Sequence, residues 1–430
     1  MPLHDKTILI ISQVYVPDSP AVGQHFHDAA AALAKRGHRV KVITSARGYD
    51  DPTLKFPARE TRDGVEIRRM PLSSFGNASI PLRILAQLLF LVQAIAHGLF
   101  TRKLACLFVS TSPPMCAVGA LVIRAIRRVP LKYWVMDVNP DQVIELGKMK
   151  PGSLPVKLML RFQQAVLKRA DDVIVLDRFM GDRINKMRDV SEKLHVIPPW
   201  AHDDVLEPIP HETNPFRKDY ALDGKFVVMY SGNHGFSTPV TTILDAAVRL
   251  KDRDDIVFAF IGGGVGKEDV RRTIATHNPG NILDLPYQPL EKIKYSLSAA
   301  DLHVVTVGPQ VVGVVHPCKV YGAMAVARPI LLVAPDPCHA SDILKNHEIG
   351  WHVNHADVDA TVAAIEQAAS ASPERRARMG ELAREALAAE FASARSIALV
   401  CDVIERGVVE ASAPAPAADA QNEPARETAA

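Results

Sequence analysis

Short apolar runs alternate with segments of helical length along the first half of the chain. A run such as Thr7–Gln13, which is apolar on both faces, is typical of a strand inside a parallel sheet. Repeated strand–helix units of this size predict an α/β fold with a doubly wound parallel sheet. We expect strands at Thr7–Gln13, Arg39–Thr44, Val65–Pro71, Leu104–Ser110, Leu131–Val135 and Asp172–Leu176. We expect helices at Phe26–Lys35, Leu82–Phe100, Met115–Arg127 and Leu154–Arg169.

The second half repeats this pattern, so we expect a second Rossmann-like sheet that faces the first across a cleft. A chain of 430 residues exceeds what one core supports, and the five prolines between Ile197 and Pro215 suit a hinge. We therefore predict domains at residues 1–197 and 216–372, a linker at 198–215 and a helical segment at 373–410. Residues 411–430 are rich in Ala, Pro and Glu and are expected to be disordered. The strands expected in the second half are Lys225–Ser231, Ile256–Ile261, Ile282–Leu285, Leu302–Val307 and Ile330–Ala334.

The charge balance and the cysteines narrow the class of protein. The 50 basic and 48 acidic residues leave a net charge of +2, which gives no overall attraction to nucleic acid. The five cysteines are odd in number and form no CxxC pair, so we expect reduced thiols in a cytoplasmic protein and no zinc site. The polar start of the chain leads straight into a strand and predicts no signal peptide.

The stretch from Gly313 to Leu332 is the strongest pointer to a ligand. It predicts a loop, then a helix that begins near Pro317, because proline fits a first turn whose N–H groups have no intrahelical partner. The other amides of that turn stay free and the helix dipole favours negative charge, so the turn is suited to an anion. Lys319, with His316 beside it, adds positive charge. Such a loop suits a diphosphate and indicates a nucleotide-linked substrate.

Glycines follow strands in both halves of the chain. Gly23 opens the first helix, and Gly232, the run Gly262, Gly263 and Gly264, and Gly313 follow strands of the second half. Glycine lets a backbone approach a ligand closely, so these positions are candidates for ligand contact, together with Asn233 and His234. The alternative is that the glycines form ordinary turns between strands and helices.

Two carboxylates stand at the edge of the first sheet where ligands of parallel sheets bind. Asp137 and Asp141 follow the strand Leu131–Val135, and either could contact a sugar there. The alternative is local, since Asn139 or Asp141 could cap the helix that follows. His316 and His234 likewise have both a functional and a structural interpretation.

The helix expected at Leu82–Phe100 is unusually apolar. It is about as long as a membrane span, but it carries polar residues and lies between two sheet strands, which argues against spanning. Two interpretations remain, a helix packed in the core and a surface helix that touches lipid. Basic residues nearby fit peripheral contact with an anionic bilayer, namely Arg102, Lys103, Arg124, Arg127, Arg128 and Lys132.

These segments together resemble a family 4 (group 1) glycosyltransferase of the GT-B fold, of the kind found in bacterial surface-polysaccharide synthesis. The resemblance covers residues 6 to 410, and its weight lies in the order and spacing of the matching pieces. They are Arg36–Thr44, Asp137–Gly147, Arg169–Leu176, Tyr230–Gly235, Phe260–Gly264, Ala299–Leu302 and Lys319–Pro329.

The resemblance implies retaining transfer of a sugar from a UDP- or GDP-linked donor to a lipid-linked or polysaccharide acceptor. It implies no metal or other cofactor, a cytoplasmic location that includes the inner face of the plasma membrane, and a C-terminal helix that crosses back to the first domain. With the features above, we expect Asp137, His316 and Lys319 to be catalytic. The expected donor-binding residues are Gly23, Gly232, Asn233, His234, Gly262, Gly263, Gly264, Gly313, Val314, Lys319, Tyr321 and Gly322.

The sequence departs from the family at one motif. Two glutamates that normally flank the donor's sugar and ribose are replaced by Val314 and Gly322. This departure keeps two alternatives open, a non-catalytic protein that binds nucleotide sugars or acts as a scaffold, and a non-hydrolysing nucleotide-sugar epimerase.

Overall fold

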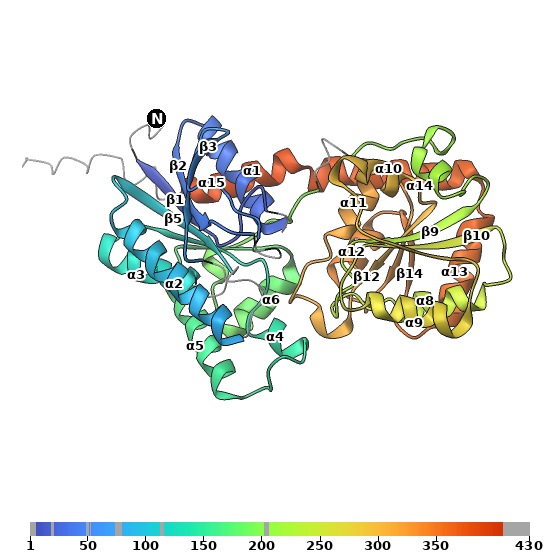
Figure 1. Cartoon of the computed structure of the whole chain (residues 1–430), viewed down its shortest axis with the longest axis horizontal. Helices are drawn as coiled ribbons and strands as arrows, with labels where there is room; N and C mark the ends of the chain where they lie inside the picture. The colour runs from blue at the N-terminus through green and yellow to red at the C-terminus, as the bar shows by residue number, and fades with distance from the viewer. Residues whose placement is uncertain are drawn as a thin grey trace, which may run out of the picture.

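The computed structural model describes residues 6–18, 21–48, 51, 53–73, 80–111, 116–201 and 206–406, without the side chains of residues 80, 81 and 83. It shows two α/β lobes side by side, with C-terminal helices running across both (Figure 1). The tail predicted to be disordered at 411–430 and residues 202–205 of the predicted linker lie outside the described residues.

The N-terminal lobe is built on an eight-stranded sheet in the order β3-β4-β2-β1-β5-β6-β7-β8. All neighbours pair in parallel except β3, which lies antiparallel to β4 at the edge. The sequence RETR of β3 has no apolar run, which is why the alternation of apolar segments did not predict it. The strands are β1 (Thr7–Ile11), β2 (Arg39–Ser45), β3 (Arg59–Arg62), β4 (Val65–Met70), β5 (Leu104–Ser110), β6 (Leu131–Trp134), β7 (Asp172–Val175) and β8 (Leu194–Val196).

Aromatic side chains fill the core between this sheet and its helices. Trp134 stacks on Phe108 and on Trp200, with ring centroids 5.5 and 5.9 Å apart, and Phe26 packs edge-on against Trp134. Within the described ranges, no helix has both the length and the hydropathy needed to cross a bilayer. The helices of this lobe are α1 (Ala21–Lys35), α2 (Ile80–Leu99), α3 (Cys116–Arg127), α4 (Asp141–Glu145), α5 (Leu154–Arg169) and α6 (Arg178–Met187).

The C-terminal lobe contains a six-stranded, fully parallel sheet in the order β11-β10-β9-β12-β13-β14. This order reverses between β9 and β12, and ligands of doubly wound sheets bind beyond the carboxyl ends of the strands at such a point. The predicted fold class, two Rossmann-like doubly wound sheets, is therefore confirmed. The strands are β9 (Phe226–Ser231), β10 (Ile256–Ile261), β11 (Ile282–Leu285), β12 (Leu302–Thr306), β13 (Ile330–Val333) and β14 (Gly350–Val353). The helices are α7 (Pro215–Asp219), α8 (Thr241–Arg249), α9 (Lys267–His277), α10 (Ile293–Ser298), α11 (Lys319–Ala325), α12 (His339–Asn346) and α13 (Val358–Ser370).

The C-terminal helices connect the two lobes. Helix α14 (Pro373–Ala386) packs on α11, and after a π-helical turn α15 (Ser393–Glu405) packs on α1 of the other lobe. There the Arg36 guanidinium donates to Asp402 at 2.7 Å and to Glu405 at 2.9 Å, and a ring nitrogen of His38 lies 2.7 Å from Glu405. Helix α15 thus returns to the N-terminal lobe (Figure 1).

Candidate functional site

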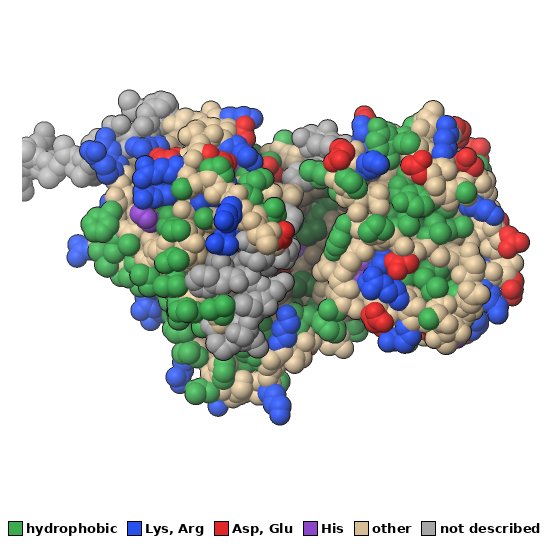
Figure 2. Space-filling view, in the orientation of Figure 1, with side chains coloured by type: hydrophobic (Ala, Val, Ile, Leu, Met, Phe, Trp, Pro, Cys, Tyr) green, Lys and Arg blue, Asp and Glu red, His purple; other side chains and the backbone are tan. Residues whose placement is uncertain are grey.

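A hollow separates the two lobes on the face shown in Figure 2. In the C-terminal lobe, a cavity of about 300 Å³ lies over β9, β10 and β12, between α10 and α11. It is therefore at the point where the strand order reverses. Its lining is Ser231, Gly232, Ile261, Tyr287, Gln288, Ile293, Ser296, Leu297, His303, Val304, Val305, Lys319, Gly322 and Ala323.

Lys319 is the cation of this cavity. Its ammonium lies 5.2 Å from the centre of the Tyr230 ring, and its aliphatic stem lies against Gly232. A Cβ at Gly232 would come within 2.7 Å of Lys319 Cε, so the absence of a side chain at 232 makes room for the lysine. Lys319 thus stands at the cavity wall with its charge supported by an aromatic face.

The helix that carries Lys319 begins later than predicted. Helix α11 starts at Lys319 rather than near Pro317, and it has only seven residues. The amide of Val320 donates to the Pro317 carbonyl at 3.3 Å, and that of Tyr321 to the Cys318 carbonyl at 3.2 Å. The predicted row of free first-turn amides is therefore wrong at Val320 and Tyr321, and anion binding here rests mainly on Lys319.

The glycines after β9 and β10 allow two loops to pack against each other. A Cβ at Gly262 would lie 2.1 Å from the Gly232 carbonyl oxygen, and one at Gly264 would lie 2.3 Å from Asn233 Oδ1. All three glycines have positive φ, at +128°, +127° and +113° for 232, 262 and 264. A Cβ at Gly263 would approach the Tyr287 ring to 2.9 Å. These glycines shape the rim beside Lys319.

His234 supports this rim from inside the protein. It is fully buried, its amide donates to the Gly263 carbonyl at 2.8 Å, and its Nδ1 lies 3.1 Å from the Gly232 carbonyl oxygen. Burial, together with the charge of Lys267, lowers the pKa of His234 to about 4. His234 is therefore neutral at pH 7, and its contacts favour the structural interpretation.

Asp137 lies in the N-terminal lobe, in the loop after β6. Thr111 Oγ1 accepts the Met136 and Asp137 amides at 3.1 Å, which fixes the loop after β6. Among the described residues, none forms a hydrogen bond or ion pair with the Asp137 carboxylate, and burial raises its pKa to about 6. Partly buried and unpaired, this carboxylate is available to a ligand.

The Asp137 loop directly contacts the chain segment that leads to Lys319. The Val138 amide donates to the Val314 carbonyl at 3.0 Å. Cys318 is exposed, yet the protein atoms around its thiol exclude enough water to raise the thiol pKa to about 11. The charge of Lys319 lowers this pKa, and the charge of Asp137 raises it. The charges of Asp137 and Lys319 thus both act on Cys318, the residue that precedes Lys319 in the chain.

Val314 and Gly313 belong to the contact between the lobes, and neither lines the cavity. Val314 is fully buried, with its carbonyl bound to Val138. Gly313 has φ +70°, and a Cβ there would lie 2.5 Å from the Phe179 carbonyl oxygen. Among the described residues, both positions are therefore in contact with the backbone of the N-terminal lobe, Gly313 with Phe179 and Val314 with Val138.

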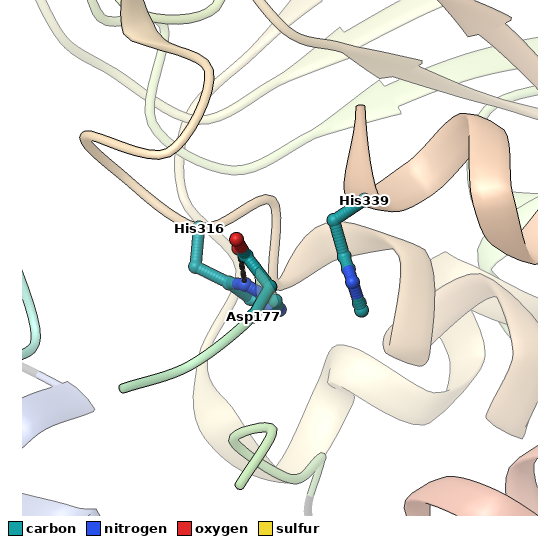
Figure 3. A group of neighbouring side chains, drawn as sticks. All are labelled: Asp177, His316 and His339. Carbon is teal, nitrogen blue, oxygen red and sulfur yellow. Dashed lines mark hydrogen bonds and ion pairs between the residues drawn. The ribbon is translucent and has the colours of Figure 1, made fainter. Parts of the chain in front are cut away.

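His316 and Tyr321 form a buried polar network with Asp177 and His339. Figure 3 shows Asp177, His316 and His339. His316 Nδ1 lies 2.6 Å from the Asp177 carboxylate, and the Tyr321 hydroxyl lies 2.8 Å from Nε2 of each histidine. Asp177 comes from the N-terminal lobe and the other three from the C-terminal lobe. The network therefore joins the lobes, and it is an alternative to the catalytic role predicted for His316.

The network is satisfied without an ion. Donor atoms of Asp177, His316 and His339 lie within 4.8 Å of one another, close enough to suggest a metal site. Both nitrogens of His316 and Nε2 of His339, however, already have hydrogen-bond partners. Burial, followed by the charge of His316, lowers the pKa of His339 to about 3, so His339 is neutral at pH 7.

Two models of known families match the chain. The model "Glycosyl transferase 4-like domain" matches residues 21–200, and the model "Glycosyl transferases group 1" matches residues 212–386. Each model falls on one lobe, and together they include Asp137 and Lys319. The chain belongs to the group 1 glycosyltransferase family.

Relatives and solved structures agree with this assignment. WbjE of Pseudomonas aeruginosa, assigned as a glycosyltransferase, is 28% identical over 222 residues, which are 51% of this chain and only 55% of WbjE. WcaI of Escherichia coli, assigned as a glycosyl transferase of colanic acid biosynthesis, is 23% identical over 374 residues, which are 84% of this chain and 91% of WcaI. Sucrose-phosphate synthase of Thermosynechococcus elongatus superposes with a TM-score of 0.76 at 16% identity, over 95% of this chain and 100% of that one. Anabaena HepE, solved with UDP and glucose, superposes with a TM-score of 0.70 at 15% identity, over 93% and 100%. At such identities the structures show the shared GT-B fold alone.

In this glycosyltransferase, contacts within the chain account for two other positions singled out in the sequence, Gly23 and Asp141. A Cβ at Gly23 would lie 2.9 Å from Tyr15 Cα, so the close approach there is to the chain's own backbone. Helix α4 has no side-chain cap, and Asp141 instead pairs with Arg183 at 2.9 Å. Gly322, by contrast, lines the cavity as expected for a donor-binding residue.

Sequence reasoning missed much of the cavity lining, including Tyr287 and Gln288, and it missed Asp177 and His339 of the inter-lobe network. Tyr287 and Gln288 follow β11, so the rule that ligands bind after parallel strands could have found them. Asp177 and His339 acquire their partners only through the fold, since Asp177 and His316 are 139 residues apart.

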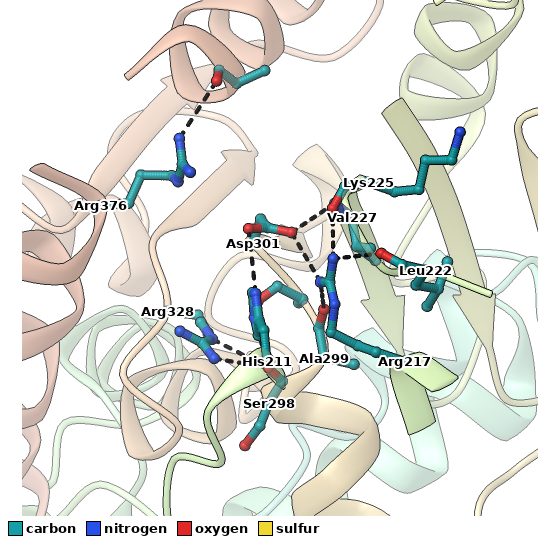
Figure 4. Close-up of polar contacts among 12 residues, drawn as sticks. His211, Arg217, Leu222, Lys225, Val227, Ser298, Ala299, Asp301, Arg328 and Arg376 are labelled. Carbon is teal, nitrogen blue, oxygen red and sulfur yellow. Dashed lines mark hydrogen bonds and ion pairs between the residues drawn. The ribbon is translucent and has the colours of Figure 1, made fainter. Parts of the chain in front are cut away.

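A second hollow, of about 570 Å³, lies at the opposite, amino end of the same sheet. Figure 4 shows that the Arg217 guanidinium there donates hydrogen bonds to the carbonyls of Ala299, Leu222 and Lys225 and to the Asp301 carboxylate. The Arg217 side chain is buried, and all of these partners are residues of the C-terminal lobe, so the contacts have a structural role. These contacts hold the start of the C-terminal lobe to β9 and β12.

The inter-lobe network yields a stability prediction. Burial alone would raise the pKa of Asp177, but the hydrogen bond and charge of His316 outweigh it, and the pKa lies below its ordinary value. We expect Asp177→Ala to lower the free energy of unfolding by about 3–5 kcal/mol, because His316 loses a buried partner. Urea titration at pH 7 measures this change.

The control is Arg178→Ala at the adjacent position. Arg178 pairs with Asp342 at 2.7 Å, also between the lobes, but its side chain is 57% exposed. Exposed pairs contribute only about 0–1 kcal/mol. Equal losses for the two variants would contradict a special role for the buried network.

Proposed function

We propose that this glycosyltransferase moves a sugar, with retention of configuration, from a nucleotide sugar to a lipid-linked or polysaccharide acceptor in cell-surface glycan synthesis. The observation that carries the proposal is the cavity at the point where the strand order of the C-terminal lobe reverses, with Lys319 in its wall. Asp137 of the other lobe, whose carboxylate has no hydrogen bond or ion pair among the described residues, acts electrostatically on Cys318, the residue before Lys319.

The cavity supports a nucleoside diphosphate as the donor group. Its apolar wall, which includes Ile293, Leu297 and Val305, suits a base, and Lys319 suits the diphosphate. HepE, which shares the fold, was solved with UDP and glucose. This favours a uridine nucleotide, with a guanosine nucleotide as the alternative.

In the proposed reaction the bond from the sugar's anomeric carbon to the diphosphate oxygen breaks, and a bond to the acceptor oxygen forms on the same face. Lys319 stabilises the negative charge that develops on the leaving diphosphate. Asp137 stabilises the positive charge that develops on the sugar. The acceptor's proton passes to an oxygen of the leaving phosphate, so no enzymatic nucleophile is required.

Transfer assays with a panel of UDP- and GDP-sugars test the proposal. The purified protein is incubated with each donor and with extracted polyprenyl-linked saccharides, and release of the free nucleoside diphosphate is measured. The expected result is acceptor-dependent release with one donor, and NMR of the product should show the donor's anomeric configuration. Tight nucleotide binding without turnover, for any donor and acceptor, would instead indicate a binding or scaffold protein.

An apolar surface on the N-terminal lobe supports the proposal of a lipid-linked acceptor. Helices α2 and α3 pack together and expose Leu85, Leu88, Val92, Val122 and Ile126. Arg102 and Arg128 are exposed beside them, and the outer face of this lobe carries hydrophobic and basic side chains (Figure 2). An apolar face with a basic fringe is complementary to an anionic bilayer, so we propose docking at the inner face of the plasma membrane.

We expect the double variant Leu88→Glu/Val92→Glu to lower partitioning onto vesicles of phosphatidylglycerol by about 100-fold, because each side chain loses roughly 1.5 kcal/mol of burial. Flotation of vesicles at low salt measures it. The control is Leu399→Glu, which changes an exposed leucine on α15, away from α2. Equal flotation of the double variant and the unmodified protein would exclude this surface.

A further inference from the structure

Gly322 leaves an open position in the wall of the donor cavity. It lies in α11, one helical turn after Lys319. A Cβ at this position would meet only Leu297 Cδ1, at an ordinary contact distance of 3.7 Å, and Gly322 does not have positive φ. The fold therefore does not require glycine, which in a helix costs roughly 0.5–1 kcal/mol relative to alanine.

The cavity lacks the group that usually holds a ribose. Its lining among the described residues includes no aspartate or glutamate; its polar side chains are hydroxyls, one amide, His303 and Lys319. Rossmann-like sites commonly bind the ribose 2′-hydroxyl with a carboxylate. The position of the ribose follows from its neighbours, since it links the diphosphate at Lys319 to the base at the apolar wall. We therefore place the ribose beside Gly322, which is next to Lys319 along the helix.

The missing carboxylate has a consequence for specificity. A site with buried groups directed at a hydroxyl rejects an analogue without that hydroxyl, because those groups stay unpaired. The described lining has no carboxylate, so loss of the hydroxyl leaves no buried negative charge unpaired. The apolar residues Ile261, Ile293 and Leu297 also offer a favourable surface to the methyl group that distinguishes thymine from uracil.

We propose that the donor cavity does not recognise the 2′-hydroxyl, and that this enzyme accepts 2′-deoxyribonucleotide sugars, thymidine diphosphate sugars included, as well as it accepts ribonucleotide sugars. Gly322 is the specificity-determining residue. The proposal rests on the nucleotide-sugar function proposed above and names the class of donor that the same site takes.

Calorimetric titration with matched nucleotide pairs tests the proposal. UDP and dUDP form one pair and GDP and dGDP the other, so the base need not be known. The expected result is that the preferred pair binds with dissociation constants within about threefold of each other, and that dTDP matches dUDP or binds more tightly. A preference of thirtyfold or more for the ribonucleotide would overturn the inference and leave the proposed function intact. Failure of all five nucleotides to bind would count against the proposed function itself.

Gly322→Glu supplies the missing carboxylate. This variant is expected to bind the ribonucleotide at least tenfold more tightly than its deoxy partner, whereas Gly322→Ala keeps the ratio near one. The alanine variant controls for the added Cβ and for the change in helix propensity. If both variants fold, as circular dichroism would show, and neither changes the ratio, Gly322 does not determine the specificity.

Discussion

Replacement of Lys319 by alanine is expected to reduce turnover by about 10²–10³-fold and to weaken nucleotide-sugar binding. Lys319 is the cation of the donor cavity, and one preorganised charge or donor at a developing negative charge is worth about that much in rate. Binding is measured by titration with UDP and GDP, and turnover by release of the nucleoside diphosphate.

Two further variants give this experiment a control. Lys319→Met keeps the aliphatic stem against Gly232 and removes only the charge, so it should lose nearly as much activity as the alanine variant. Lys251→Ala removes an exposed lysine beyond the end of α8 and should change neither value. Unchanged affinity of Lys319→Ala for every nucleotide would refute the assignment of the donor cavity.

Replacement of Asp137 by asparagine is expected to have opposite effects on activity and stability. Turnover should fall by at least about 100-fold, because the carboxylate no longer balances positive charge on the sugar. The melting temperature at pH 8 should rise by a few degrees, because the protein no longer holds a partly buried, unpaired charge. A gain in stability with a loss of activity would mark a residue kept for function.

The pH dependence of both effects follows from the raised pKa of Asp137. Burial moves this pKa from 3.8 to about 6, so the fold favours the protonated form. Ionisation therefore costs stability progressively as pH rises from about 4 to above 6, and the advantage of Asp137→Asn should vanish near pH 4. Turnover of the unmodified enzyme should rise as pH passes through about 6. Calorimetric scans and rates between pH 4 and 8 measure both.

Asp141→Asn is the matched control, since Asp141 is four residues away and is paired with Arg183. Its removal should bring no gain in melting temperature and little loss of turnover. If Asp137→Asn retained full activity, the N-terminal side of the proposed reaction would have to be assigned to another residue.

Most of the fold could be predicted from the sequence, because a parallel strand that is buried on both faces requires consecutive apolar residues, and such a run is visible in the sequence. β1, β5 and β13 are buried at nearly every position, and each contains an uninterrupted apolar run. The edge strands β3, β8 and β14 are half-buried or exposed except at Val353, and no such run marks them.

The candidate site was only partly predictable for the same reason. Lys319 and Gly322 stand on a single short helix, so local sequence indicates their common location. Tyr321 and His316 stand equally close to Lys319 in the chain, yet they point into the network with Asp177 and away from the donor cavity. Which way a side chain points depends on a partner 139 residues away, and no local pattern records that.

The sequence by itself determined the two parallel sheets, the family resemblance and the lysine proposed to serve the donor, because these depend on the order of neighbouring residues. Only the tertiary structure decided that the Asp137 carboxylate has no partner among the described residues, that His316 joins the lobes, and that Gly322 leaves a vacant space in a cavity wall. Those three properties depend on segments far apart in the chain, and burial and pairing of charge exist only once these segments are packed.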